Sequence, residues 1–268
     1  AGQGVYTPEN RHTASAESDW TASLDELQAV CPNLSRVALI VSWFGSDLRA
    51  GHCQVQPKVD RANKKTHGAT WSVAGLTRAT AEAATLHEGR PAFGGTPSDS
   101  SVVRAIQDLH ARGLQVMFYP FVMMDIPVEN ALENPYTGES GQPAYPWRGQ
   151  ITCDPAPGRE GSPDGSGTAA AQVQALFGAA EAADFSASGT TVSYSGPAEW
   201  SLRRMVLHYA KLCAAAGGVE SFLIGSEFEA LTRVRSAPGV YPAVNELVAL
   251  AAEARTILGS GTKISYAA

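Results

Sequence analysis

The sequence predicts an α/β fold built on a parallel sheet, and a β/α barrel is the form of that fold that suits it best. Four apolar segments are typical of core strands, because they are continuous and rich in β-branched residues. Helical patterns separate the segments, which is the alternation found in parallel-sheet proteins. No GxGxxG or GxxxxGK[ST] motif follows any of them, so the common nucleotide-binding folds are excluded. The four segments are RVALIVSWF (36–44), QVMFYPFVMM (115–124), SFLIGS (221–226) and TKISYAA (262–268).

Capping residues locate the first two helices. Ser23 and Glu26 have the S-x-x-E spacing of a capping box, which predicts a helix that reaches about Cys31. Ser98 or Asp99 can cap the next helix, whose apolar residues recur at helical spacing up to a closing glycine. The long connections that follow the first two strands suit the βα loops of a barrel.

Three more helices are expected in the C-terminal half. One covers roughly 168–183. The clearest pattern lies within 193–218, where Pro197 is expected at the first helical position and Glu199 in the first turn. The last helix is expected from about 242 to 258.

The composition excludes several classes of function. The chain has 268 residues, of which 44% are hydrophobic and 17% are charged, as in an ordinary globular domain. The formal net charge of −6 argues against specific nucleic-acid binding, because phosphate recognition needs a basic face. No run of about 18 apolar residues occurs, so no membrane span is expected. The N-terminal segment also lacks the apolar stretch of a secretory signal peptide.

The nucleophilic and metal-ligating residues form no recognisable site. The six histidines and four cysteines lack metal-ligand spacing, and no C-x-x-C pair occurs, so we expect neither a metal nor a cofactor. Ser195 and Ser226 lack the G-x-S-x-G elbow, so a serine nucleophile is not expected. Cys213 is predicted to be a buried helix residue, and the bonding state of the cysteines stays open. The cysteines are Cys31, Cys53, Cys153 and Cys213.

The last apolar segment has no following element to cover it. A full barrel has eight strands, and the sequence predicts only the four segments above as strands. We therefore expect residues 1–268 to be a single domain that forms the N-terminal part of a barrel, within a longer polypeptide. Expressed alone, such a segment should be poorly soluble or molten, because half a barrel exposes strand edges and an open core.

Many unusual short sequence motifs occur in one order along the chain, and together they resemble one family. They include VYTPENRHT, SDWTASLDELQAVCPN, VSWFGSDLRAG, FYPFVMMD, QPAYPWRGQITCDPAPG and GGVESFLIGSEFEALTRVRS. Over about residues 3–268 the sequence resembles the glycoside-hydrolase TIM-barrel-like domain of gene transfer agents and related phage tail proteins. That domain lies within a large tail-tip hub protein, sometimes called the megatron.

The resemblance implies a function at the tail baseplate of a phage-like particle. It implies action on, or binding of, host cell-surface or cell-wall polysaccharide, including peptidoglycan, during DNA delivery. The implied partners are other tail and baseplate proteins and the rest of the hub chain, in a trimeric assembly. The implied location is the tail tip of a particle that is assembled in the cytoplasm and is extracellular after release.

Glu227 is the candidate catalytic residue. It directly follows the predicted strand 221–226, and residues past the carboxyl end of a parallel strand face the binding crevice. Retaining glycosidases use two carboxylates about 5 Å apart, one as acid/base and one as nucleophile. In the barrel glycosidases that the resemblance points to, the acid/base glutamate ends strand 4 after an asparagine, and the nucleophile ends strand 7. Glu227 fits the first position, although Ser226 replaces the asparagine, and the nucleophile would lie beyond residue 268.

The alternative for Glu227 is a purely structural role at the start of the next helix, where the helix dipole favours a negatively charged side chain. Glu229 is expected to be such a solvated helix residue. Under the first alternative the domain is a retaining glycoside hydrolase. Under the second it is a non-catalytic structural or glycan-binding barrel of the tail hub.

Further aromatic and charged residues gather at the expected strand ends and in the loop that contains Trp147. Sugars stack on aromatic rings, while carboxylates and guanidinium groups take their hydroxyls. Trp43, Tyr119, Glu227 and Tyr266 are expected near one rim, although such aromatics can also simply pin long loops to the barrel. The candidate substrate-binding residues are Trp43, Asp47, Arg49, Tyr119, Asp125, Trp147, Arg148, Ser226 and Tyr266.

Overall fold

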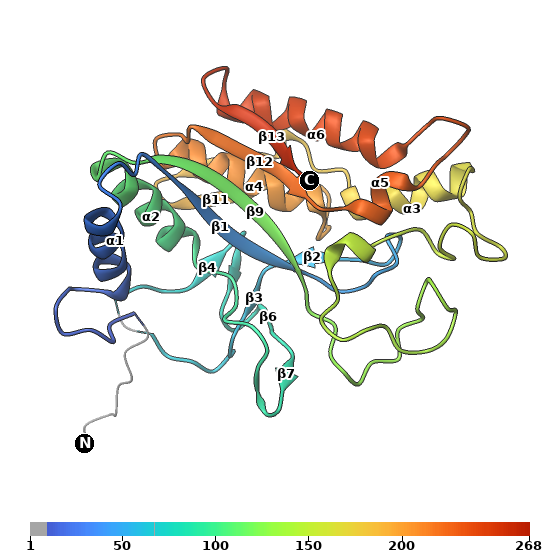
Figure 1. Ribbon diagram of the computed structural model, residues 1–268, viewed down its shortest axis with the longest axis horizontal. Coiled ribbons are helices and arrows are strands. Elements are labelled where there is room, and N and C mark those ends of the chain that lie inside the picture. The colour runs from blue at the N-terminus through green and yellow to red at the C-terminus, as the bar shows by residue number, and fades with distance from the viewer. Residues whose placement is uncertain (1–9, 67) are drawn as a thin grey trace.

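The central element of the computed structural model, which describes residues 10–66 and 68–268, is a five-stranded sheet of order β13-β12-β9-β1-β2 (Figure 1). Four strands are parallel, and the short β2 pairs antiparallel with the end of β1. The predicted α/β fold with a parallel sheet is therefore confirmed. Among the described residues the sheet stays open, with β13 and β2 at its edges, as in an incomplete barrel. The strands are β1 (Arg36–Gly45), β2 (Val55–Gln56), β9 (Gln115–Met124), β12 (Ser221–Ser226) and β13 (Lys263–Ala267).

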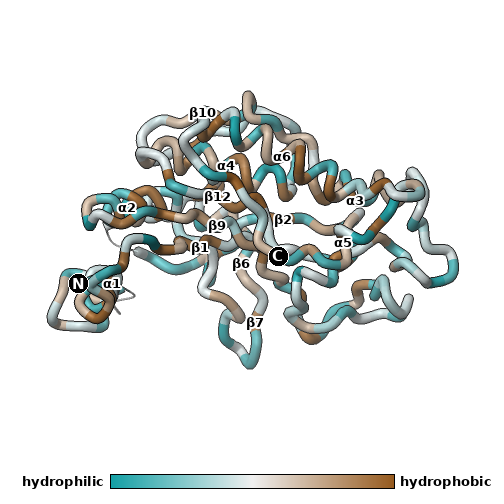
Figure 2. The backbone as a smooth tube through the Cα atoms, turned by 45° about the horizontal axis from the view of Figure 1, so that its top comes forward, coloured by the Kyte–Doolittle hydropathy of each residue, from teal (hydrophilic) through white to brown (hydrophobic). Residues whose placement is uncertain are grey.

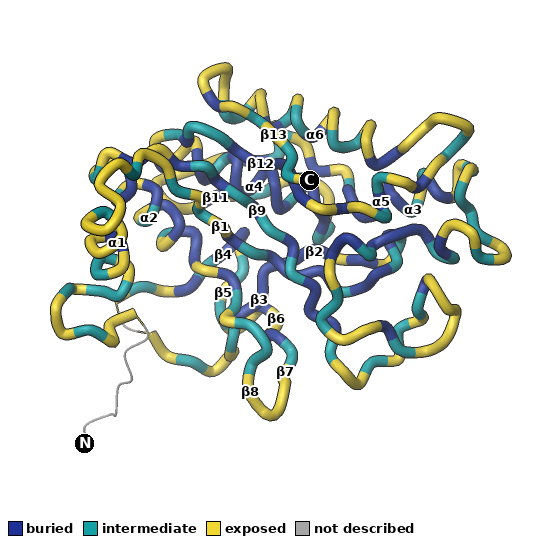
Figure 3. Tube along the Cα trace, in the orientation of Figure 1, coloured by how far each residue is buried: buried dark blue, intermediate teal, exposed yellow. Residues whose placement is uncertain are grey.

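Helices α2, α4 and α6 cover one face of the sheet (Figure 1). Figure 2 shows hydrophobic segments along the sheet strands and α4, and Figure 3 shows buried residues along α4, β12 and the C-terminal half of β1. The core therefore lies between the sheet and these helices. The helices are α1 (Asp19–Val30), α2 (Asp99–Ala111), α3 (Gly167–Phe177), α4 (Leu202–Ala215), α5 (Glu229–Arg233) and α6 (Pro242–Leu258), with 3-10 turns η1 (Arg148–Gln150) and η2 (Ala182–Asp184).

Strand alternation divides the two faces of the sheet. Successive side chains of a strand point to opposite faces, and along β9 every second residue, from Val116 to Met124, is buried against the helices. Tyr119 and Phe121 lie on the opposite face and are only half-buried. On the same opposite face of β1, Ile40 is 53% exposed. The second face thus lacks a helix layer within the described part of the chain.

The connection between β1 and α2 is long and contains several short two-stranded elements. The strands β3 and β6 pair in parallel, whereas β4–β5 and β7–β8 are antiparallel hairpins. A further hairpin, β10–β11, precedes α4. These strands are β3 (Lys58–Val59), β4 (Ser72–Val73), β5 (Leu76–Thr77), β6 (Glu82–Ala83), β7 (Leu86–His87), β8 (Arg90–Pro91), β10 (Phe185–Ser188) and β11 (Thr191–Tyr194).

Two helix starts differ from the sequence prediction. Helix α1 begins at Asp19 because Ser18 caps it by accepting a hydrogen bond from the Thr21 N–H, so the predicted capping box at Ser23 lies inside the helix. Helix α4 begins only at Leu202, with Ser201 as its cap. The prediction that Pro197 starts that helix is wrong, because the preceding residues pair with β10 to form a hairpin.

The remaining element predictions agree with the structure at most boundaries. Ser98 caps α2, and α6 runs over the predicted range. Helix α3 ends earlier than expected, at Gly178, whose φ of 77° only glycine adopts without strain. Cys213 is buried in α4 as predicted, and all four cysteines are free thiols. No helix among the described residues has both the length and the apolar character to cross a bilayer.

Candidate functional site

Glu227 lies at the carboxyl end of the parallel strands, directly after β12. Its backbone φ is 53°, in the left-handed region that non-glycine residues rarely adopt. The Glu227 N–H donates to the carbonyl oxygen of Ala267 at 3.0 Å, which joins this turn to the end of β13. The side chain remains 43% exposed. The turn therefore holds a carboxylate at the end of the sheet at a backbone cost of about 1–3 kcal/mol.

Two neighbouring residues of one loop hold the Glu227 carboxylate. Trp147 donates its indole Nε1–H to Oε2 at 2.6 Å, and Nη2 of Arg148 lies 3.0 Å from the same oxygen. The other oxygen, Oε1, accepts no hydrogen bond from any described residue. Glu227 precedes α5, and its carboxylate bonds to these side chains rather than to the amides of that helix. The carboxylate of Glu227 therefore does not cap α5.

Arg148 connects Glu227 to two strands. Its guanidinium is almost fully buried, with 5% of the side chain exposed, and lies 3.7 Å above the ring of Phe121 on β9. Its Nε donates to the Ser226 carbonyl oxygen at 3.0 Å, and its Nη2 donates to the Ser226 hydroxyl at 2.8 Å. Nη2 also lies 3.5 Å from the Tyr119 hydroxyl. Ring contact and forked hydrogen bonds together fix the guanidinium in one orientation.

Tyr266, on β13, packs beside the turn that contains Glu227. Its hydroxyl accepts a hydrogen bond from the Phe228 N–H at 2.7 Å, and burial raises the pKa of its phenol. A Cβ atom on Gly225 would lie 3.2 Å from the Phe228 ring and 3.4 Å from the Tyr266 ring. Gly225 therefore permits the close approach of the two rings to the end of β12.

We call the group of residues that meet here the Glu227 site. The structure brings together most of the predicted site residues, and it adds Phe121, which the alternation along β9 could have placed beside Tyr119. Among the described strands, β12 is the third of the four parallel ones along the chain. The Glu227 site consists of Tyr119, Phe121, Trp147, Arg148, Ser226, Glu227 and Tyr266.

Trp43 is not at the rim, contrary to the prediction. It is fully buried on the helix side of the sheet, on the same face as Val41. Its Nε1–H donates to the Tyr209 hydroxyl at 2.9 Å, and its ring packs edge-on against Trp200. The continuous apolar run of β1 concealed which face each side chain occupies, so the prediction placed Trp43 on the wrong one.

Asp47 and Arg49 form a separate ion-pair network. Asp47 is 3% exposed, and its Oδ2 lies 2.8 Å from Nη2 of Arg49. Its Oδ1 accepts from Nε2 of Gln142 at 2.7 Å, while the Gln142 Oε1 accepts from the Leu48 N–H at 2.8 Å. The hydrogen bond with Asp47 raises the pKa of Arg49. The network joins the loop that contains Gln142 to the end of β1, so these residues pin a loop and do not contact Glu227.

Asp125 also makes its contacts with other residues of the protein and lies outside the Glu227 site. Its side chain is completely buried and lies 3.0 Å from the Lys58 ammonium, which is itself 8% exposed. The Thr85 hydroxyl and N–H donate to the same carboxylate at 2.6 and 3.1 Å. The pair anchors the β1–α2 connection to the end of β9. Lys58 and Gln142 were not predicted, because nothing in the local sequence distinguishes them from solvated residues.

The buried histidine in the helix layer is structural. Nε2 of His208 on α4 lies 2.9 Å from Oδ1 of Asp99 on α2, and both side chains are buried. The pair therefore joins α4 to α2 within the helix layer. Within 10–66 and 68–268, no group of three or more histidine, cysteine, aspartate or glutamate side chains is arranged to hold a metal ion.

Comparison with known proteins gives a match for one part of the chain. Residues 200–268, from the start of α4 to β13, match the GTA TIM-barrel-like domain, and this part includes Ser226, Glu227 and Tyr266. Comparison with curated proteins finds no match. A solved structure described as a complex of a GH113 β-1,4-mannanase is similar with a TM-score of 0.42 and 15% sequence identity. The similarity covers 96% of this chain and 52% of that one, so the chain spans about half the length of the solved structure.

Proposed function

We propose that this domain binds a glycan chain at the Glu227 site. The observation that supports the proposal most is the carboxylate itself. Glu227 is partly exposed at the carboxyl end of a parallel sheet, and its Oε2 is held by Trp147 and Arg148. Oε1 is thereby oriented to accept a hydrogen bond from a ligand hydroxyl. A carboxylate fixed in this way loses little conformational freedom when it binds.

The surroundings of Glu227 suit a sugar ring. Trp147 is 45% exposed and offers an indole surface next to the carboxylate. An aromatic surface beside oriented polar groups is the pattern that recognises the apolar and hydroxylated faces of a pyranose. Tyr119 adds a hydroxyl on the open side of β9.

A second candidate function is glycoside hydrolysis, with Glu227 as the general acid/base. The position of Glu227 directly after a parallel strand favours it, because barrel enzymes carry their catalytic residues there. A retaining mechanism also needs a second carboxylate about 5 Å away. Within the described part of residues 1–268 the contacts of Glu227 are with hydrogen-bond donors that orient its carboxylate for binding, so glycan binding is our first proposal.

The proposed setting is the baseplate hub of a phage-like tail that engages host cell-surface polysaccharide or peptidoglycan during DNA delivery. The match of residues 200–268 to a GTA TIM-barrel-like domain supports this setting. The proposed partners are other tail and baseplate proteins and further hub sequence, in a trimeric assembly at the tail tip of the released particle.

The test uses the longer polypeptide that completes the barrel, with purified peptidoglycan and envelope polysaccharide. Glu227→Gln keeps the shape of the side chain and removes its charge, so affinity should fall about tenfold, the effect of losing one charge-assisted hydrogen bond. Glu229→Gln is the matched control, since Glu229 pairs with the exposed Arg233 on α5. Release of soluble sugar is measured in parallel. If the wild type releases sugar, Glu227→Gln should cut turnover by about 10²–10⁴-fold.

Equal glycan affinity and equal sugar release by the wild type and Glu227→Gln would refute a role for this residue. Binding without any sugar release, together with weaker binding by Glu227→Gln, would support the binding function and reject hydrolysis.

A further inference from the structure

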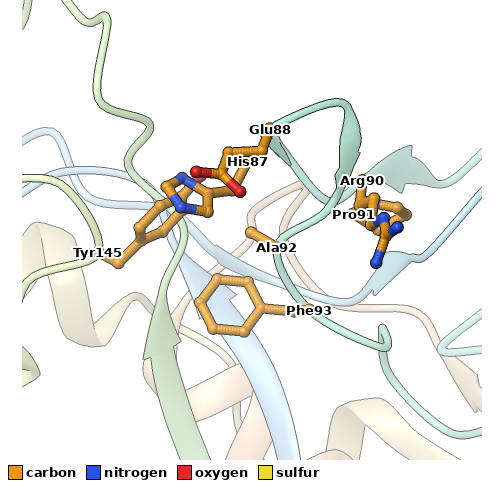
Figure 4. A pocket seen from close by; sticks show the side chains of 7 residues that line it. All are labelled: His87, Glu88, Arg90, Pro91, Ala92, Phe93 and Tyr145. Atoms are coloured by element: carbon orange, nitrogen blue, oxygen red, sulfur yellow. The ribbon is translucent and has the colours of Figure 1, made fainter.

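A cavity of about 630 Å³ lies beside the β7–β8 hairpin, outside the Glu227 site (Figure 4). Its volume falls within the range of about 300–1,000 Å³ that is typical of small-molecule sites. Figure 4 shows Tyr145 and His87 on one side of Ala92, and Arg90 on the other. Five of the lining residues carry the inference: His87, Glu88, Arg90, Phe93 and Tyr145.

The hairpin that forms one wall is held in a defined conformation. Leu86 pairs with Pro91, and the Ala92 N–H donates to the carbonyl oxygen of Thr85 at 2.8 Å. The two turn residues, Glu88 and Gly89, have φ of 50° and 75°, as in the two-residue turns that match the twist of antiparallel strands. Thr85, at the base of the hairpin, is bound to the buried carboxylate of Asp125. The wall is therefore anchored to the end of β9.

Tyr145 forms the opposite wall and is equally constrained. Its φ is 46°, a backbone conformation that an aromatic residue keeps only where its surroundings impose it. Its ring lies edge-to-face with His87 and with Phe93, at centroid distances of 5.9 and 5.6 Å. Phe93 in turn packs on the buried Phe44 at 5.3 Å. The aromatic lining is thus already in place without a ligand.

The rim of the cavity carries one charge of each sign. Glu88 and Arg90 lie in the exposed tip of the hairpin (Figure 3). Neither side chain makes a hydrogen bond or an ion pair with any described residue. A strongly anionic ligand would meet the Glu88 carboxylate, and a strongly cationic one would meet the Arg90 guanidinium. A hydroxyl-rich, uncharged ligand can instead use both groups as hydrogen-bond partners.

The cavity and the Glu227 site share one loop. Tyr145 lines the cavity, whereas Trp147, two residues later, bonds to Glu227. Two residues of extended chain span at most about 7 Å, so the backbone positions of these aromatic residues are close together. One polymeric ligand can therefore contact both.

We propose that this cavity is a second pyranose-binding subsite, which takes a further sugar unit of the glycan held at the Glu227 site. The inference rests on the proposed function. The aromatic lining of Phe93 and Tyr145 supplies surface for the apolar face of the sugar, and Glu88 and Arg90 bind its hydroxyls.

The test measures the affinity of the full chain, by calorimetry, for soluble glycan fragments of increasing length prepared from a purified uncharged envelope polysaccharide. Wild type should bind long fragments at least about tenfold more tightly than fragments that fill one subsite. Tyr145→Ala should abolish this gain while leaving the affinity for the shortest fragments unchanged. The double change Glu88→Gln and Arg90→Gln, at an exposed hairpin tip, should reduce the gain without disturbing the fold. Tyr241→Ala, an exposed tyrosine at the start of α6, is the control.

The outcomes separate the two proposals. If Glu227→Gln weakens binding but the hairpin and Tyr145 variants bind fragments of every length as wild type does, the subsite is refuted and the glycan-binding function stands. If wild type binds no fragment of any length, both proposals fail.

Discussion

Replacing Arg148 by methionine should destabilise the protein by about 3 kcal/mol. The substitution keeps the approximate length of the side chain and removes its donors. The carbonyl and hydroxyl oxygens of Ser226, which is 2% exposed, then lose their partner. Each buried acceptor left without a partner costs about 1–3 kcal/mol. Loss of the cation–π contact with Phe121 adds about 1 kcal/mol.

Two effects limit this loss of stability. The ion pair with Glu227 adds little, because that carboxylate is 43% exposed and solvent screens it. Removing a buried guanidinium also removes its desolvation cost, which offsets part of the lost hydrogen bonding. Arg148→Lys keeps the charge but loses the planar set of guanidinium donors, so its destabilisation should lie between that of the wild type and that of Arg148→Met.

The assay is urea unfolding, followed by far-UV circular dichroism and by tryptophan fluorescence. An unchanged dependence of stability on urea would show that the variant and the wild type expose the same surface on unfolding. Arg233→Met is the matched control, because Arg233 is 73% exposed and pairs with an exposed glutamate. It should change stability by less than about 0.5 kcal/mol. If Arg148→Met costs no more than Arg233→Met, then Arg148 does not organise the Glu227 site.

Three further predictions concern other parts of the molecule. Lys58→Met should cost about 3–5 kcal/mol, because it leaves the buried Asp125 carboxylate without its countercharge and with only the Thr85 donors; thermal unfolding measures this, and a loss below 1 kcal/mol would contradict it. Gly225→Ala should cost about 1–3 kcal/mol by crowding Phe228 and Tyr266, and it should weaken glycan binding in calorimetry; wild-type behaviour in both assays would reject the packing role. The hydrogen bond from Arg235 lowers the pKa of Asp164 below its ordinary value of 3.8, so this pair stabilises the fold above that pH, and the contribution is lost as the pH falls through the lowered pKa. Asp164→Asn should therefore be less stable than wild type near neutral pH and should approach it in acid, and a difference that is constant with pH would refute the linkage.

The sequence predicted the four parallel strands well, because core strands of a parallel sheet are marked by continuous apolar, β-branched runs, and it predicted none of the short strands in the connections. It predicted poorly on which face of the sheet each side chain lies, since such runs lack the alternation of polar and apolar residues that distinguishes the two faces. Trp43 was misplaced for this reason. Pro197 was likewise misread, because proline suits a hairpin flank as well as a first helical turn. The start of α2 was predicted to within one residue, with Ser98 or Asp99 as the cap, because that signal is local.

The site was predicted only in part for a different reason. Trp147, Arg148 and Glu227 could be proposed from their residue types and positions near strand ends. The roles of Asp47 and Asp125 depend on Gln142 and Lys58, which lie 95 and 67 residues away along the chain. Such pairings are set by how the loops fold back on the sheet. No local spacing rule contains that information.

The left-handed backbone at Glu227 has a consequence for which residues the chain can accept there. Glycine or asparagine would adopt this backbone conformation at lower cost. The backbone conformation at position 227 therefore favours glycine or asparagine, whereas the contacts with Trp147 and Arg148 favour a carboxylate. Replacing Glu227 by glycine or asparagine would release strain and remove the partly exposed carboxylate in the same step. Screening for thermostability alone would therefore tend to select against glutamate at this position, and screening for glycan recognition would retain it.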